Sequence, residues 1–174
     1  MSQALITIRR ANPTDAEQIA AVHDDAWREA YRGLIPGGEL ERMIARRGPD
    51  WWRRAVAQGS RLLVFSLHGK IGGYVSYGRN RALSMDFDGE IFELYLLPEY
   101  QGMGFGARLF RAGRADLAAH GLDTMLVWTL SDNVRAVEFY RRRGGLEVRR
   151  ASEHFGGEKL GRLAFGFGPP GEIR

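Results

Sequence analysis

The sequence predicts an α/β protein, and three features of the chain support this. Short apolar runs typical of strands alternate with amphipathic stretches of helical period along the whole length. One of these runs, residues 90–97, leads through Pro98 and three closely spaced glycines into a helical pattern. The 174 residues suit one domain with a substantial core, and no repeat or linker interrupts them. We therefore expect a single domain over residues 1–174, with a frayed tail from Gly168 onward.

The first half of the chain predicts one strand, three helical segments and a β-hairpin. Thr14 and Glu17 have the spacing of a capping box at the start of the first helix, and Gly33 ends that helix. Two apolar runs separated by a short turn at 68–70 are typical of a hairpin. The expected segments are a strand at 4–10, a helix between 14 and 33, helical pieces at 39–47 and 51–56, hairpin strands at 61–67 and 71–77, and an exposed loop at 79–89.

The second half predicts two strand–helix units followed by two more strands. Glycines stand at the end of both helices, where a left-handed residue commonly closes a helix. The expected segments are a central strand at 90–97, a helix at 104–120, a strand at 124–130, a helix at 133–143, and strands at 147–150 and 160–167.

The glycines at 102, 104 and 106 predict an anion-binding turn. Glycine allows positive φ and a close approach of backbone to a ligand, and the free N–H groups at a helix start favour phosphate. The spacing does not fit a dinucleotide fingerprint, because the third glycine comes one residue early. A P-loop is excluded because no lysine follows the glycines. A tight strand–helix connection without a ligand is the alternative.

Two motifs together resemble those of the GNAT superfamily of acetyl-CoA-dependent N-acetyltransferases. Gln101-x-x-Gly104-x-Gly106 is similar to the pyrophosphate-binding loop of that superfamily. The block at 133–145, NVRAVEFYRRRGG, is similar to its Asn-x-x-Ala-x-x-Phe-Tyr-x-x-x-Gly helix and follows at the expected distance. The resemblance is specific from about residue 90 to 146 and only approximate before that.

The resemblance implies a fold and an activity. The fold is an α/β sandwich on a mixed, mostly antiparallel sheet of about six to seven strands flanked by helices. The activity is direct transfer of acetyl from acetyl-CoA to a primary amine of a small molecule or peptide in a ternary complex. Because the chain has no cysteine, a thiolate nucleophile is excluded. The alternative is a non-catalytic acyl-CoA-binding or regulatory domain of the same fold.

The same resemblance implies how the cofactor is held. Main-chain groups of the central strand pair with pantetheine, amides of the glycine loop hold the pyrophosphate, and Gln101 braces that loop. Asn133 matches an asparagine that contacts pantetheine, although asparagine is also a favoured helix N-cap. The expected cofactor-binding residues are Leu94, Tyr95, Leu96, Gln101, Gly102, Met103, Gly104, Phe105, Gly106, Ala107 and Asn133.

Three side chains are candidates for acid–base chemistry. Tyr140 matches the general acid of the superfamily. A tyrosine, with a pKa near ~10 against ~8.5 for a thiol, is protonated at neutral pH and has a proton to give to a departing thiolate. Glu90 and Glu93 are the candidate bases, with Glu93 preferred because it directly precedes the pantetheine segment. Strand alternation puts these glutamates on opposite faces unless a bulge intervenes. A packed tyrosine and exposed strand charges are the alternatives.

The acceptor side is less well defined by the sequence. His23, Trp27 and Tyr31 occupy the position where the first helix of relatives borders the acceptor pocket. A packed aromatic helix face is the preferred interpretation for His23, and Trp27 and Tyr31 could line the pocket and still belong to the core. Trp128 stands where certain peptide N-terminal acetylating relatives have a glutamate, which argues against a ribosomal-protein substrate.

Composition constrains the partners. The formal charge of +4 and the pI near 9.7 come almost wholly from arginine, but acidic residues are interspersed and no basic, aromatic-rich helix stands out. We therefore expect no nucleic-acid partner. No apolar run has the length of a membrane span and no signal peptide is evident, so we expect a cytoplasmic protein without a membrane partner. The four histidines are scattered, so no metal is expected. A homodimer is left open.

Overall fold

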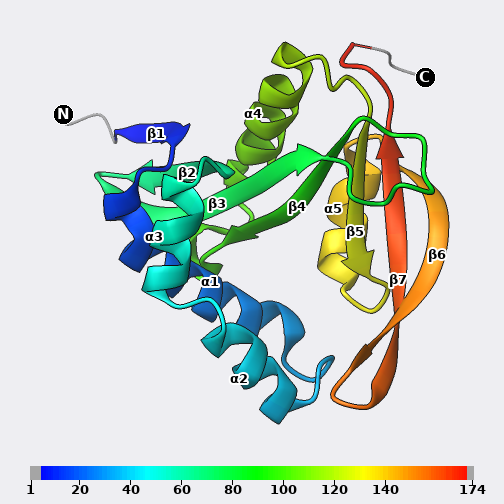
Figure 1. Ribbon diagram of the computed structural model, residues 1–174, viewed down its shortest axis with the longest axis horizontal. Helices are drawn as coiled ribbons and strands as arrows, with labels where there is room; N and C mark the ends of the chain where they lie inside the picture. Colours follow the sequence, from blue (N-terminus) through cyan, green and yellow to red (C-terminus); the bar gives the residue numbers. More distant parts are fainter. Residues whose placement is uncertain (1–4, 172–174) are drawn as a thin grey trace.

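The computed structural model describes residues 5–171, which form one seven-stranded sheet with helices on both faces (Figure 1). The strand order is β1-β2-β3-β4-β5-β7-β6. The strands are β1 (Ile6–Arg10), β2 (Arg61–Leu67), β3 (Lys70–Arg79), β4 (Gly89–Leu96), β5 (Met125–Leu130), β6 (Leu146–Phe155) and β7 (Glu158–Phe167). The helices are α1 (Ala16–Tyr31), α2 (Gly37–Ala45), α3 (Pro49–Ala57), α4 (Phe105–Ala119) and α5 (Val134–Arg142), with 3-10 turns η1 (Pro13–Asp15) and η2 (Pro98–Tyr100).

The sheet is mixed and mostly antiparallel, as the sequence predicts. Only β4 and β5 run parallel among neighbouring strands of the described residues. A parallel pair needs a crossover, and α4 supplies it. The parallel ladder is short, because its pairs end at Ile91 opposite Val127. Beyond that point β4 and β5 diverge (Figure 1).

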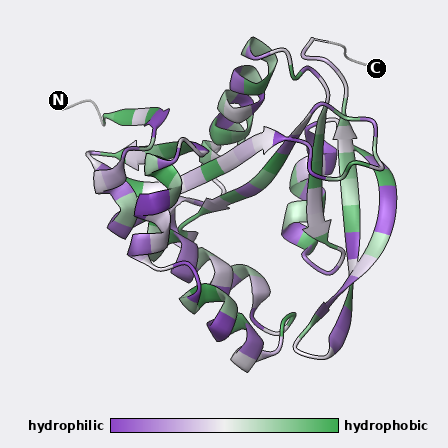
Figure 2. Cartoon of the chain, in the orientation of Figure 1, coloured by the Kyte–Doolittle hydropathy of each residue, from purple (hydrophilic) through white to green (hydrophobic). Residues whose placement is uncertain are grey.

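Two apolar layers hold the helices on the sheet. One face carries α4 and α5 over a core that includes Leu109, Phe110 and Phe165. The other face carries α1 and α3 over a core that includes Ile19 and Trp52. Hydrophilic and hydrophobic bands alternate along the helices, as expected for helices with one face on a sheet (Figure 2). No helix within residues 5–171 is both long and apolar enough to cross a membrane.

Two local predictions were wrong. The predicted capping box of Thr14 and Glu17 is absent; Asn12 accepts a hydrogen bond from the Thr14 amide, and Asp15 accepts one from the Asn12 amide at 2.8 Å. The box therefore lies around η1, and α1 begins only at Ala16.

The strand predicted at 147–150 is also too short, because β6 and β7 form a long hairpin at the sheet edge. Every residue of β6 before Phe155 is exposed, so no apolar alternation marks its length. Of the tail predicted from Gly168, residues 172–174 lie outside the described part. Gly168 itself is attached, because its carbonyl accepts a hydrogen bond of 2.5 Å from Arg114.

Candidate active site

The glycine loop ends in a helix start whose amides are free. Gly102 and Gly104 have φ of 76° and 82°, a left-handed conformation that favours glycine. Gly104 caps α4. Within residues 5–171, no carbonyl or side chain accepts a hydrogen bond from the amides of 102–107. These amides and the positive end of the α4 dipole form a site suited to phosphate.

Two neighbours shape this loop. A Cβ on Gly106 would lie 3.2 Å from Phe139 of α5 and 3.5 Å from Leu96 of β4, so this glycine permits close packing. The Gln101 side chain donates a hydrogen bond of 3.1 Å to the Leu96 carbonyl and accepts one from Arg135. Gln101 therefore links the loop to the end of β4 and to the first turn of α5. Met103 is exposed and Phe105 is buried, stacked on Phe65.

The second half of β4 has an open edge. Glu93 to Leu96 pair with β3 only, because the ladder to β5 stops at Ile91. Main-chain groups of Leu94, Tyr95 and Leu96 thus lie beside the gap between the diverging strands, and this edge ends at the glycine loop. An extended ligand chain with amide groups could pair with it as an added strand does.

Helix α5 borders the same gap. Asn133 is its N-cap and accepts a hydrogen bond of 3.3 Å from the Ala136 amide, which confirms the capping alternative without testing a cofactor contact. Tyr140 is buried against Phe110, Phe139 and Phe165. No described residue hydrogen-bonds to its hydroxyl, and burial raises its pKa above the ordinary value. Its hydroxyl therefore stays protonated at neutral pH.

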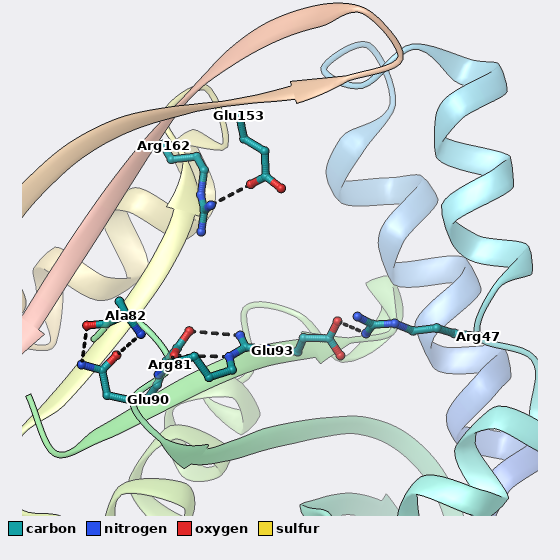
Figure 3. Close-up of polar contacts among 8 residues, drawn as sticks. Arg47, Arg81, Ala82, Glu90, Glu93, Glu153 and Arg162 are labelled. Carbon is teal, nitrogen blue, oxygen red and sulfur yellow. Dashed lines mark hydrogen bonds and ion pairs between the residues drawn. The ribbon is translucent and has the colours of Figure 1, made fainter. Parts of the chain in front are cut away.

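A β-bulge puts Glu90 and Glu93 on one face of β4. Ser76 pairs with Glu93 and the next residue, Tyr77, pairs with Ile91, so Phe92 is the extra residue. Glu90 is bound by Arg81, through its backbone amide at 2.9 Å and its guanidinium at 3.1 Å. Glu93 points instead toward Arg47, which follows α2 (Figure 3). The two glutamates share a face but have different partners.

Glu93 is a buried carboxylate held from two sides. Its side chain is 10% exposed, and Arg47 pairs with one of its oxygens. The Tyr74 hydroxyl donates to the other at 3.2 Å. Burial, and then the charge of Glu93, raises the Tyr74 pKa well above the ordinary value. Because a carboxylate has about four acceptor positions, Glu93 keeps capacity for a further donor such as a water or an amine.

Aromatic rings surround this carboxylate. Tyr31 of α1 and Tyr95 of β4 share a hydrogen bond of 2.5 Å between their hydroxyls, and burial raises the pKa of Tyr31 to about 12. The Arg47 guanidinium lies 5.6 Å from the Trp27 ring centroid and 5.0 Å from that of Trp51. Trp27 and Tyr31 thus lie near the Arg47–Glu93 pair.

His23 behaves differently from its two neighbours on α1. It is fully buried, 4.6 Å from Trp27 between ring centroids, and its Nδ1 lies 3.2 Å from an Asp24 oxygen. Its Nε2 has no partner among the described residues. Burial lowers its pKa from the ordinary value. The interpretation of His23 as part of a packed helix face fits this environment.

A groove of about 550 Å³ opens beside Glu93. Its walls come from α3 on one side and from the start of β2, the end of β3 and the middle of β4 on the other. The lining residues are Arg47, Trp51, Trp52, Ala55, Ser60, Arg61, Leu62, Ser76, Tyr77, Gly78, Arg79, Arg81, Phe92 and Glu93. Sequence reasoning missed Arg47 and Tyr74. Pairing of β3 with β4 could have indicated Tyr74, whereas no local pattern marks Arg47.

Residues 19–145 match the acetyltransferase (GNAT) family, which is most of the chain. The chain belongs to the GNAT acetyltransferase family. Membership makes it an acetyl-CoA-dependent acyltransferase. An uncharacterised N-acetyltransferase of Bacillus subtilis, YuaI, is 29% identical over 94% of this chain and 93% of its own.

Solved GNAT structures share the fold. A GCN5-related N-acetyltransferase from Rhodopseudomonas palustris has a TM-score of 0.75 and 24% identity, covering 97% of this chain and 98% of its own. The PaiA N-acetyltransferase of Thermoplasma acidophilum, solved with coenzyme A, has a TM-score of 0.72 and 18% identity, covering 93% and 98%. The predicted family and fold are therefore confirmed. Within residues 5–171, no three histidine or acidic side chains cluster as metal ligands would.

Proposed function

We propose that this GNAT protein transfers acetyl from acetyl-CoA to a primary amine of a small molecule or peptide by direct attack, with Tyr140 as general acid and Glu93 as base. The observation that carries the proposal is the continuity of one strand. β4 presents Glu93 on one face, an open main-chain edge at Leu94 to Leu96, and then the free amides of the glycine loop. Tyr140 lies on α5, in the same apolar cluster as Leu96 of β4.

The residues present fit acetyl-CoA, which supplies an acetyl group activated as a thioester. Amides 102–107 would hold the pyrophosphate, and Gly106 keeps that turn free of a side chain. The open β4 edge and Asn133 would hold pantetheine. The PaiA structure, which shares this fold, contains coenzyme A, and this supports acetyl-CoA as the donor.

The side chains then move protons. Glu93, directly or through a water, takes one from the acceptor ammonium, leaving a neutral amine. The amine nitrogen forms a bond to the acetyl carbon as the carbon–sulfur bond breaks, and the nitrogen releases its extra proton to solvent. Tyr140 gives its proton to the departing sulfur and regains one from solvent. The raised pKa of Tyr140 keeps its hydroxyl protonated at neutral pH, so a proton is available when negative charge develops on the sulfur.

Thiol release over a panel of primary amines tests the proposal. The protein has no cysteine, so it contributes no thiol background of its own. We expect at least one amine to raise the rate of thiol release above that of acetyl-CoA alone and to yield its N-acetyl derivative. Acetyl-CoA binding without amine-dependent release over the whole panel would favour a non-catalytic acyl-CoA-binding domain.

A further inference from the structure

The groove beside Glu93 carries more positive than negative charge. Four arginines line it, at 47, 61, 79 and 81, against the single carboxylate of Glu93. Arg81 takes no part in the Arg47–Glu93 ion pair. Its guanidinium lies 3.8 Å from the Phe92 ring centroid and pairs with Glu90. A groove of this composition attracts an anionic group.

Arg47 is the closest of these charges to the proposed base. It pairs with Glu93 through Nη1, and its Nε and Nη2 form no hydrogen bond within residues 5–171. Contacts with Trp27 and Trp51 fix the guanidinium, which has five N–H donors in a planar fork. Arg47 thus offers a held, charged donor pair close to the carboxylate.

This position creates a constraint on the acceptor. An ammonium brought to Glu93 also comes close to the Arg47 guanidinium, and like charges in a partly buried site are weakly screened. An amine without an anionic group experiences the whole of this repulsion. An acceptor with an anionic group next to its amine cancels it, because the anion pairs with Arg47 while the ammonium faces Glu93.

We propose that the acceptor is an amino-acid-like zwitterion, whose carboxylate or similar anion binds Arg47 and whose amine lies at Glu93. The proposal rests on the function proposed above. Trp51, Trp52 and Phe92 line the rest of the groove, so an apolar or aromatic side chain fits there. Arg47 is then the residue that selects acceptors by charge.

A matched set of acceptors tests this: phenylalanine, phenylalaninamide and 2-phenylethylamine, with methionine and its amide as a second set. We expect kcat/KM, corrected for the neutral fraction of each amine, to favour the free acid at least tenfold. Arg47→Gln should lower the ratio of kcat/KM for the acid to kcat/KM for the amine by about 10- to 100-fold, the worth of a charge-assisted bond, because it removes the partner of the anion and relieves the repulsion of the simple amine. Arg47→Lys keeps the charge and should retain part of the preference.

Arg46→Gln is the control, because Arg46 is exposed in the same connection and makes no ion pair among the described residues. It should leave the preference unchanged. Equal rates for acid, amide and amine with the wild-type protein would overturn the zwitterion proposal and leave the acetyltransferase proposal intact. Inactivity of the wild-type protein with every acceptor would reject the acetyltransferase proposal. In that case, the Kd values of phenylalanine and 2-phenylethylamine, measured by calorimetry with coenzyme A present, would test the charge preference independently of catalysis.

Discussion

The candidate catalytic side chains differ in how many hydrogen-bond partners the protein gives them. The hydroxyl of Tyr140 has no hydrogen-bond partner within residues 5–171, whereas Glu90 accepts from both the amide and the guanidinium of Arg81. Glu93 accepts from Arg47 and Tyr74 and still lines the groove. These environments give each residue a separate expected phenotype.

Tyr140→Phe removes only the hydroxyl and keeps the ring in its aromatic packing. If the hydroxyl protonates the thiolate, kcat should fall by roughly 10²- to 10⁴-fold with little change in the Kd for acetyl-CoA. Steady-state kinetics and calorimetry measure the two quantities. A variant with unchanged kcat and Kd would leave Tyr140 with a packing role only.

Glu93→Gln and Glu90→Gln form a matched pair on one strand face. The first should lower kcat/KM by about 10²-fold at pH values where the acceptor amine is protonated. The effect should shrink as the pH rises and the amine loses its proton unaided. The second should change the rate little, because Arg81 and burial already engage Glu90. A pH–rate profile that responds to Glu90→Gln rather than Glu93→Gln would exchange their roles.

The sequence predicts these residues better than their surroundings. Tyr140 and Glu93 follow from motif position and strand location. The Arg47–Glu93 pair could not be predicted, because it joins residues 46 positions apart through the packing of α1 and α3 on the sheet. The face shared by the two glutamates depends on the bulge at Phe92, and no glycine or other local signal marks that bulge.

At the scale of elements, α4 begins and ends at left-handed glycines, Gly104 with φ 82° and Gly121 with φ 73°. A Cβ on either would meet no atom within 4 Å. The two positions therefore impose the same backbone strain on a substituted residue, but only Gly104 belongs to the proposed phosphate loop.

Gly104→Ala and Gly121→Ala should each lower the free energy of unfolding by about 1–2 kcal/mol, the cost of a non-glycine residue in that conformation. Only Gly104→Ala should also weaken acetyl-CoA binding, by roughly tenfold, because its methyl group enters the loop. Urea denaturation and calorimetry measure both effects. Equal acetyl-CoA affinity in the two variants would argue against the loop as the phosphate site.

Nearly every helix and strand could be predicted from local patterns, namely the periodicity of apolar residues and the glycines at helix ends. β6 is the exception, and its exposed residues explain the error. The start of α1 was misplaced because two cap-forming residues, Asn12 and Thr14, compete within three positions.

For the whole molecule, the divergence of β4 and β5 leaves the strand edge at which we propose that the cofactor binds. This divergence arises from sheet geometry that no single segment encodes. The order of elements could be predicted, and so could the fold once the two motifs indicated the family. The groove and its positive charge could not be predicted, because they form where α3 meets β2, β3 and β4.

Global stability should depend on pH through His23. Burial lowers its folded-state pKa below the value near 6.5 expected when unfolded, so the unfolded chain binds a proton first. The free energy of unfolding should therefore fall as pH drops below about 6.5. Urea denaturation between pH 5 and 8 should show a flatter profile for His23→Gln than for the wild type. His154→Gln, at an exposed position, is the control. Identical pH slopes in wild type and His23→Gln would contradict this.

A single-turnover experiment with acetyl-labelled acetyl-CoA and excess protein distinguishes the proposed direct transfer in a ternary complex from a route through an acylated protein. The chain has no cysteine to carry an acyl group. We predict that the label passes from acetyl-CoA to the amine at the rate of thiol release, with no labelled protein detected at any time by mass spectrometry. Labelled protein that forms before the product and decays into it, or labelled acetate as the only product, would contradict the account.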